Sequence, residues 1–248
     1  MSQAAESRGT LGTVRNAVLL LDLLTNGPAY QHLTDLAERS GLSVPTVHRL
    51  LRSLVLADLV EQDPRSSRYS LGPEVTRLSQ RYLGRLPVLG ALSPYLVSLR
   101  DTLGATVHVA ILVRSSAVYV DRIDAADGGA YRDSHRVVDA LSTASGRILA
   151  ARGPDEAWRQ CVEAYPGTFE TSAEQSRKQW RAADYLMTTA PEMGAVGEVA
   201  VPVLDAAGSP MAALCASVTQ ALDGQGVEQV AAQLARAATA AGRTFGHG

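Results

Sequence analysis

The spacing of apolar residues changes part-way along this chain of 248 residues. In the first part, apolar side chains recur every three or four residues, which is the period of an amphipathic helix. Further on, Val107, Val109 and Ile111 alternate with other residues, which is the period of a strand. A chain of this length accommodates two domains. The change of period therefore predicts a helical first domain and a second domain that contains a sheet.

Three helices are predicted at the start of the first domain. The first lies in VRNAVLLLDLL and ends at Gly27-Pro28. The stretch LTDLAERSG gives a second, short helix. Ser43 is a good N-cap for a third helix, which is expected to run to about Leu56.

A hairpin is predicted directly after these helices. Two strand-like pieces, Leu59–Gln62 and Arg68–Leu71, flank a turn at Asp63-Pro64. A helix, a helix-turn-helix and a hairpin in this order predict a winged helix-turn-helix over residues 13–72. Residues 1–12 are small and polar, and we expect them to form a disordered tail.

The third helix, SVPTVHRLLRSL, has one apolar and one polar face. The apolar stripe consists of Val47, Leu50, Leu51 and Leu54. The opposite face consists of Pro45, His48, Arg49, Arg52 and Ser53. An isolated helix of this kind is more often a solvated surface helix than a DNA-reading one. The short helix before it and the hairpin after it, with Arg65 and Arg68 available for DNA phosphates, favour a recognition helix.

The charge is distributed unevenly between the two parts. The formal net charge of −2 excludes a protein that is basic overall. Residues 1–85 hold 10 Lys and Arg against 8 Asp and Glu, a net charge of +2, whereas residues 86–248 hold 13 against 17, a net charge of −4. The first domain is therefore the better partner for a polyanion, although this bias is mild.

The second domain is predicted to combine antiparallel hairpins with helices. A helix is expected at residues 73–85. Pro87 and Pro94 are expected to mark breaks in the connection to the second domain, and another helix ends at Gly104. Strands are expected over residues 105–113, 118–123, 196–204 and 210–218. Further helices are expected over residues 142–152, about 154–164, about 173–187 and about 224–245. One sheet with helices packed against it is an α+β arrangement.

Enzyme and metal chemistry find little support in the sequence. The histidines show no metal-ligand spacing; they are His32, His48, His108, His135 and His247. Ser145 precedes a glycine but lies in no G-x-S-x-G nucleophile elbow, and no glycine-rich phosphate loop occurs. His108 alternates with valines on a strand and is expected to be a satisfied structural residue. We expect no catalytic constellation, metal or cofactor.

The cysteine content and the hydropathy pattern indicate the compartment. Cys161 and Cys215 are the only cysteines, so neither a disulfide framework nor a cysteine zinc cluster is expected. No signal-peptide-like run and no stretch long enough to span a membrane is found. A cytoplasmic protein that does not bind membranes is the expectation.

Residues 33–80 resemble the DNA-binding domain of the IclR family of bacterial transcriptional regulators. The motifs that carry the resemblance are Leu36-Ala37-Glu38, Gly41-Leu42, Thr46-Val47-His48-Arg49-Leu50-Leu51 and Tyr69-Ser70-Leu71-Gly72. The resemblance continues through TVHVAILVRSSAVYVDRI, STASGRILAA and VAVPVLDAAGSPMAALCASV. It covers nearly the whole chain after the first residues.

This resemblance implies a fold and a function. The fold is an N-terminal winged helix-turn-helix, a linker helix over residues 73–86, and a C-terminal GAF-like domain over residues 87–248 that binds a small effector and helps to form dimers or tetramers. The function is sequence-specific binding of a pseudo-palindromic operator in double-stranded DNA, with repression favoured over activation. Two alternatives are an enzyme with an accessory N-terminal domain and a degenerate winged helix that only binds proteins.

The residues expected to contact DNA lie on the third helix and the hairpin. They are Ser43, Val44, Pro45, Thr46, His48, Arg49, Arg52, Arg65 and Arg68. Relatives often have Lys and Ser where this chain has Val44 and Pro45. A proline in the first turn of a helix loses no hydrogen bond. Our hypothesis is that Val44 and Pro45 contact thymine methyl groups while the arginines make polar contacts.

The resemblance also implies which residues line the effector site, between the sheet and the start of the STASG helix. They are Ala144, Ser145, Thr188, Glu198, Cys215 and Ser217. Glu198 is the largest departure, because relatives commonly have Cys or Ser there. A buried carboxylate must be paired, hydrogen-bonded or protonated, so Glu198 is expected to bind an amine or hydroxyl of the effector or to pair with an arginine such as Arg132. Alternatively, the pocket is closed or Glu198 faces solvent. Cys215 is expected to be a small buried residue.

Overall fold

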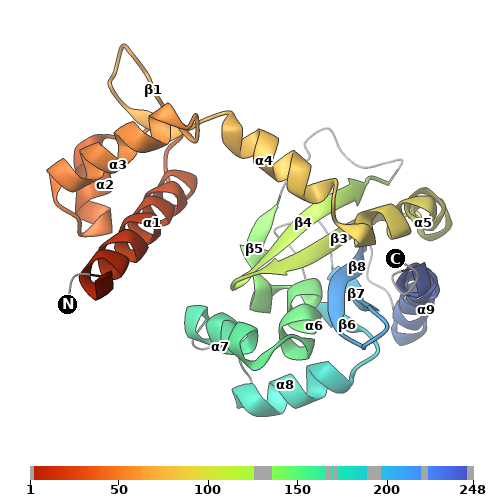
Figure 1. Cartoon of the computed structure of the whole chain (residues 1–248). Helices are drawn as coiled ribbons and strands as arrows, with labels where there is room; N and C mark the ends of the chain where they lie inside the picture. The colour runs from red at the N-terminus through yellow and green to blue at the C-terminus, as the bar shows by residue number, and fades with distance from the viewer. Residues whose placement is uncertain are drawn as a thin grey trace. The chain divides into compact units, whose positions relative to one another are not determined.

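The chain forms two compact units, Met1–Arg85 and Leu86–Gly248, in a computed structural model (Figure 1). The structure describes residues 3–125, 136–165, 169, 172–188, 197–218 and 223–244, with side chains from residue 12 onward. The expectations for Arg132, His135 and His247 lie outside the described residues.

The first unit is a bundle of helices with a two-stranded hairpin. Its elements are α1 (Gln3–Thr25), α2 (Leu33–Ser40), α3 (Val44–Leu56), β1 (Val60–Gln62), β2 (Tyr69–Leu71) and α4 (Glu74–Leu83). The core combines Leu20 of α1, Leu36 of α2 and Leu51 of α3, all without exposed surface. These side chains lie on the apolar stripes that the sequence indicates, so burying the stripes brings the three helices together.

The wing, which is the hairpin of β1 and β2, is shorter than the sequence pattern indicates, and a third segment pairs with it. β1 and β2 are each one residue shorter than expected and pair antiparallel, with Val60 opposite Leu71. Gln31, just before α2, forms an isolated bridge with Tyr69 through two backbone hydrogen bonds of 2.9 and 2.8 Å. A single bridging residue leaves no periodic pattern, which is why the sequence did not reveal it.

The start of α1 differs from the expectation of a disordered tail over residues 1–12. The helix begins at Gln3. The segment up to residue 12 contains good helix formers at its start and no proline, and the helix runs through Gly9 and Gly12 to join the predicted one. Met1 and Ser2 lie outside the described residues.

The second unit is one antiparallel sheet with helices on both faces, which confirms the α+β class. Its helices are α5 (Pro87–Leu103), α6 (Ala144–Arg152), α7 (Asp155–Ala164), α8 (Ala173–Ala182), α9 (Gly224–Gly242) and a 3-10 turn (Ala140–Ser142). Its strands are β3 (Thr106–Val113), β4 (Ser116–Ile123), β5 (Val137–Asp139), β6 (Leu186–Thr188), β7 (Gly197–Leu204) and β8 (Pro210–Val218). The strand order is β5-β4-β3-β8-β7-β6.

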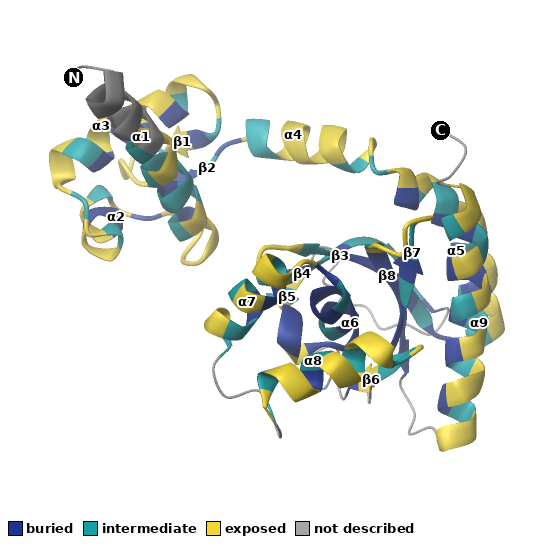
Figure 2. Cartoon of the chain, turned by 60° about the horizontal axis from the view of Figure 1, so that its bottom comes forward, coloured by how far each residue is buried: buried dark blue, intermediate teal, exposed yellow. Residues whose placement is uncertain are grey.

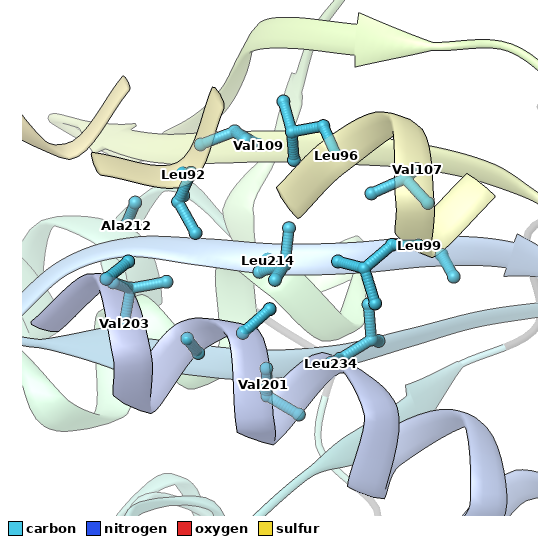
Figure 3. Packing of buried hydrophobic residues seen from close by; sticks show 14 of the residues in the cluster. Leu92, Leu96, Leu99, Val107, Val109, Val201, Val203, Ala212, Leu214 and Leu234 are labelled. Atoms are coloured by element: carbon cyan, nitrogen blue, oxygen red, sulfur yellow. The ribbon is translucent and has the colours of Figure 1, made fainter. Parts of the chain in front are cut away.

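The main apolar core lies between one face of this sheet and helices α5 and α9 (Figure 3). Val107 and Val109 of β3 and Leu214 of β8 point to this side and contact Leu96 of α5 and Leu234 of α9. The alternate residues of the same strands point to the opposite face, which α6 covers. Figure 2 shows that α6 itself is largely buried. The opposite face therefore forms a second, enclosed layer.

Three elements of the second unit differ from the expectations. Pro87 and Pro94 do not break the passage: α5 starts at Pro87 and continues through Pro94. Pro87 suits the first turn, and burial of an apolar face against the sheet holds the helix together across Pro94. The helix expected over 173–187 ends at Ala182, and Leu186–Thr188 form the edge strand β6. β5, at the other edge, is a strand that the sequence pattern missed.

Candidate DNA-binding surface and buried carboxylate cluster

Helix α3 starts as its sequence dictates. Ser43 has extended backbone angles and caps the helix, because its hydroxyl accepts a hydrogen bond of 3.4 Å from the Thr46 amide. The Ser43 and Thr46 hydroxyls are also 2.8 Å apart. Val44 and Pro45 form the first turn, where the missing proline N–H has no helical partner to lose. The helix therefore stays intact although this chain has Val44 and Pro45 where relatives often have Lys and Ser.

The two faces of α3 are separated as the helical period predicts. The buried face consists of Val47, Leu50, Leu51 and Leu54. The exposed face presents Val44, which keeps 45% of its surface, beside Pro45, His48, Arg49 and Arg52. Within the part of the chain that the structure describes, neither Arg49 nor Arg52 forms a salt bridge. The expected DNA-contacting residues of α3 are thus accessible to a partner, although Thr46 is half-buried and only partly accessible.

The turn of the wing is fixed by Asp63. Its carboxylate accepts hydrogen bonds of 3.1 Å from the amides of Arg65 and Ser66 and another from the Ser66 hydroxyl. The Ser66 hydroxyl and the Arg65 amide lower the pKa of Asp63, so the carboxylate stays charged as an acceptor. The Arg68 Nε donates to His32 Nε2 at 3.1 Å, which ties the wing to the residue before α2. Arg65 and Arg68 are exposed, as expected.

The start of α6 brings together residues that are far apart in the chain. Thr143 caps the helix, and its hydroxyl accepts from the Gly146 amide at 3.1 Å. The Ala144 amide donates to the Thr188 hydroxyl of β6 at 2.9 Å. The Ser145 amide donates to Glu198 Oε1 of β7 at 2.7 Å. Four of the six expected effector-site residues therefore contact one another directly at this helix end.

Glu198 lies in the interior and has no exposed surface. Its Oε2 accepts a hydrogen bond of 2.5 Å from the Tyr119 hydroxyl, which also lies 3.1 Å from the Ser145 hydroxyl. We call Tyr119, Ser145 and Glu198 the carboxylate cluster. The alternative in which Glu198 faces solvent is wrong, because β7 lies inside the sheet and the side chain points toward α6. The pKa of Glu198 is raised overall, because burial outweighs the hydrogen bonds from Tyr119 and Ser145, which act to lower it.

The other two expected effector-site residues lie on the same sheet face. Ser217 of β8 is opposite Glu198 in the strand register, and Cys215 is two residues away on β8. The Ser217 hydroxyl is 2.9 Å from Nε2 of the buried His108. Burial is the main cause that lowers the pKa of His108 to about 4, so the ring is neutral at pH 7. This confirms the expectation of a satisfied structural histidine.

Tyr119 is the member of the cluster that sequence reasoning missed. It is opposite Ala110, just beyond a β-bulge at Val109/Ala110, and therefore shares the α6-facing side of the sheet. Burial and the neighbouring Glu198 raise its pKa, so its hydroxyl remains a hydrogen-bond donor. The available signal was a polar-tipped aromatic residue between two valines, Val118 and Val120.

Both cysteines are buried free thiols. Burial raises the pKa of Cys161 to about 11 and, together with the charge of Glu198, raises the pKa of Cys215. A thiol that stays protonated is a poor nucleophile and metal ligand. This agrees with the expectation that Cys215 is a small buried strand residue. Among the described residues, no group of three or more His, Cys, Asp or Glu is arranged to hold a metal ion.

None of the helices in the described part of the chain has the length and apolar character needed to cross a membrane. The longest of these helices, α1 and α9, contain charged residues.

Comparison with known proteins identifies both units. Residues 13–64 match the model of the IclR helix-turn-helix domain, and residues 80–243 match that of the bacterial transcriptional regulator IclR C-terminal domain. The chain is 27% identical over 245 residues to the HTH-type transcriptional regulator XynR of Escherichia coli strain K12, covering 95% of this chain and 97% of that one. It is 28% identical over 218 residues to a glycerol operon regulatory protein of Streptomyces coelicolor, covering 82% of each chain. A solved IclR transcriptional regulator from Alicyclobacillus acidocaldarius superposes with a TM-score of 0.71 at 26% identity, over 94% of this chain and 98% of that one.

Proposed function

The chain belongs to the IclR family of bacterial transcriptional regulators, and from this premise we propose that it is a homo-oligomeric repressor whose binding to a specific operator is modulated by a small molecule. As a member of this family it is a regulator with a DNA-binding and an effector-binding domain rather than an enzyme. Occupation of an operator that overlaps a promoter is sufficient for repression, which makes repression the simpler outcome. A protein acting on chromosomal DNA would work in the cytoplasm.

The observation that carries this proposal is the exposed face of α3. A capped helix that buries one apolar face and leaves Arg49 and Arg52 exposed is suited to the major groove. We assign base contacts to the first two turns, because the N-terminal residues of a recognition helix reach base edges. Arg65 and Arg68 of the wing are assigned to phosphates, as are the hydroxyls of Ser43 and Thr46.

Helix α4 supports the proposal of a homodimer. It buries none of its side chains, yet Leu78 and Tyr82 lie one turn apart and keep 47% and 55% of their surfaces exposed. Val75, one turn earlier, is half-buried and continues the same stripe. A second copy of this helix is a suitable cover for such a stripe. Two winged helices brought together in this way would read two half-sites of a pseudo-palindrome.

We further propose that the effector acts through the α6-facing side of the second unit. Ala144, Ser145 and Glu198 lie at the helix start, where their polar atoms are hydrogen-bonded within the protein, and Thr188, Cys215 and Ser217 occupy neighbouring strand positions. A molecule that binds here in only one arrangement of the domain would shift the population of the arrangement that binds DNA. The measurable consequence is that binding of the effector changes the affinity of the protein for its operator.

Selection from a random pool of duplex DNA tests the proposed DNA binding. We expect enrichment of an inverted repeat, and we expect the affinity for the selected duplex to fall steeply with salt, with a logarithmic slope of about 0.9 per phosphate contact. Fluorescence anisotropy at several salt concentrations measures the slope. A winged helix that only binds proteins would enrich no sequence and would not bind DNA even at low salt, which would overturn the proposal.

Pro45→Ser is expected to alter base preference more than general affinity. The serine variant keeps the first turn of α3, because Ser43 still caps the helix, but replaces an apolar surface by a hydroxyl. Repeating the selection with the variant should change the preferred bases within each half-site, while the Kd for random duplex changes by less than about twofold. Equal losses for selected and random DNA would reject the thymine-methyl hypothesis for Val44 and Pro45.

A further inference from the structure

The first turn of α6 already uses its three leading backbone donors. A helix N-terminus normally offers free N–H groups and a partial positive charge, which together attract an anion. Here the amides of Ala144, Ser145 and Gly146 donate to Thr188, Glu198 and Thr143, respectively. The carboxylate among these acceptors comes from within the protein, 53 residues further along the chain.

Glu198 is held in this position from several sides. One carboxylate oxygen accepts from the Ser145 amide and the other accepts from the Tyr119 hydroxyl. Its backbone lies between β6 and β8, opposite Thr188 and Ser217. The side chain is without exposed surface, so its carboxylate contacts protein groups and not bulk solvent. Both hydrogen bonds are donated to the carboxylate, as an anion requires.

We infer that the Glu198 carboxylate is a resident anion of the sensing domain, which fills the place at the start of α6 that a small carboxylate ligand would otherwise take. The wild-type domain therefore takes no small carboxylate at this position. A molecule that reaches Glu198 must instead donate hydrogen bonds, through an amine or a hydroxyl, because a carboxylate only accepts them. This inference extends the proposed effector sensing. Only its consequence for DNA binding rests on that proposed function.

The pKa of Glu198 is raised overall from its ordinary value, mainly by burial, and the groups around the carboxylate oppose this rise. Hydrogen bonds from Tyr119 and Ser145 and the positive charge of Arg136 all act to lower it. The pKa of Tyr119 and that of Cys215 are both raised, first by burial and then by the charge of Glu198. The two neighbours therefore remain protonated.

Removal of the carboxylate and its replacement from solution test the inference. Glu198→Ala deletes a group that corresponds in size and charge to acetate. In thermal unfolding of the full-length protein at pH 7.5, we expect acetate to raise the Tm of this variant by about 2–4 °C in a saturable manner, because a ligand that binds only the folded state stabilises it. Acetamide, which lacks the charge, and sodium chloride at equal ionic strength should leave the Tm unchanged. Wild-type protein should respond to acetate no more than to chloride.

Two control variants make the result specific. Glu228→Ala deletes an exposed carboxylate from α9 and should show no response to acetate. Glu198→Gln keeps the volume of the side chain, so it should fold and should also be insensitive to acetate. If Glu198→Ala is unfolded after purification, the same titration is followed by circular dichroism. Recovery of helix with acetate but not acetamide supports the inference, whereas no recovery while Glu198→Gln is folded overturns it.

Two further results would contradict the inference. An equal acetate response in wild type and Glu198→Ala, or an equal response of the variant to acetate and acetamide, would show that Glu198 does not occupy an anion site. DNA affinity is measured separately for Glu198→Ala with and without acetate. If acetate raises the Tm but leaves operator affinity unchanged, the resident anion stands and the proposed coupling between effector site and DNA fails.

Discussion

An Arg49→Ala variant is expected to bind the selected operator about 5- to 150-fold more weakly than wild type, which corresponds to about 1–3 kcal/mol for a lost bidentate base contact. Arg49 lies on the exposed face of α3 and is held outward by the packing of Leu50 and Leu51 beneath it. Because its contact is assigned to a base, the loss should be larger for the selected sequence than for random DNA. Competition binding with the two duplexes measures this ratio.

The control for Arg49→Ala is Arg236→Ala, which removes the same charge from an exposed position on α9 in the other unit. It should change neither the affinity nor the ratio. Arg65→Ala in the wing offers a second comparison, since loss of a phosphate contact should weaken both duplexes equally and reduce the salt slope by about 1. If Arg49→Ala shows that uniform pattern, Arg49 contacts a phosphate and the base readout must be assigned elsewhere on α3.

Gly146→Ala is expected to destabilise the second unit by about 3 kcal/mol or more, at the upper end of the range for overpacked sites. A Cβ on Gly146 would lie 2.1 Å from the carbonyl oxygen of Ala140 and 2.6 Å from its carbonyl carbon. These are backbone atoms of the 3-10 turn that precedes α6, so no flexible side chain can move aside. The start of α6 would have to separate from this turn, which would also disturb the carboxylate cluster.

Tryptophan fluorescence measures this effect selectively. The only two tryptophans of the chain, Trp158 and Trp180, lie in the second unit with ring centres 6.0 Å apart. Denaturant unfolding should show a lower midpoint for Gly146→Ala. Gly90→Ala on α5 is the matched control: its Cβ meets no atom within 4 Å, and alanine in a helix should stabilise by about 0.5–1 kcal/mol. Equal midpoints for Gly146→Ala and wild type would contradict the close packing described for α6.

Features that depend on neighbouring residues in the sequence were predicted well. The Ser43 cap and the apolar stripe of α3 follow from residues within a few turns of each other, and the structure has both. The long strands β3, β7 and β8 carry enough alternating residues for the period of two to be read. Each of these elements contains its own signal.

Features that depend on distant partners were missed. β5 and β6 have three residues each and become strands because they pair with β4 and β7. A segment so short has too few residues for a period, and Leu186–Thr188 follows a helical pattern that carries past its real end at Ala182. Pairing energy in the folded protein decides these assignments, and the local sequence does not contain it.

The carboxylate cluster likewise combines one feature that the local sequence predicts with one that depends on a distant partner. The alternation in VGEVAV places Glu198 on the same side of its strand as Ala200, so a carboxylate on the inner face was predictable. Its partner Tyr119 is 79 residues away, and the β-bulge at Val109/Ala110 helps to set the register that brings it there. Sequence reasoning therefore identified the need for a partner but not the partner itself.

The burial of both native thiols has a practical consequence for spectroscopy. Cys161 and Cys215 are inaccessible and remain protonated, so thiol-reactive dyes and spin labels should modify them slowly. A single cysteine introduced at an exposed position, such as Ser53 on α3, would then carry a label on an otherwise native background. Two copies labelled in this way in a dimer would report the separation of their α3 helices, and that separation determines the spacing of the half-sites they can read.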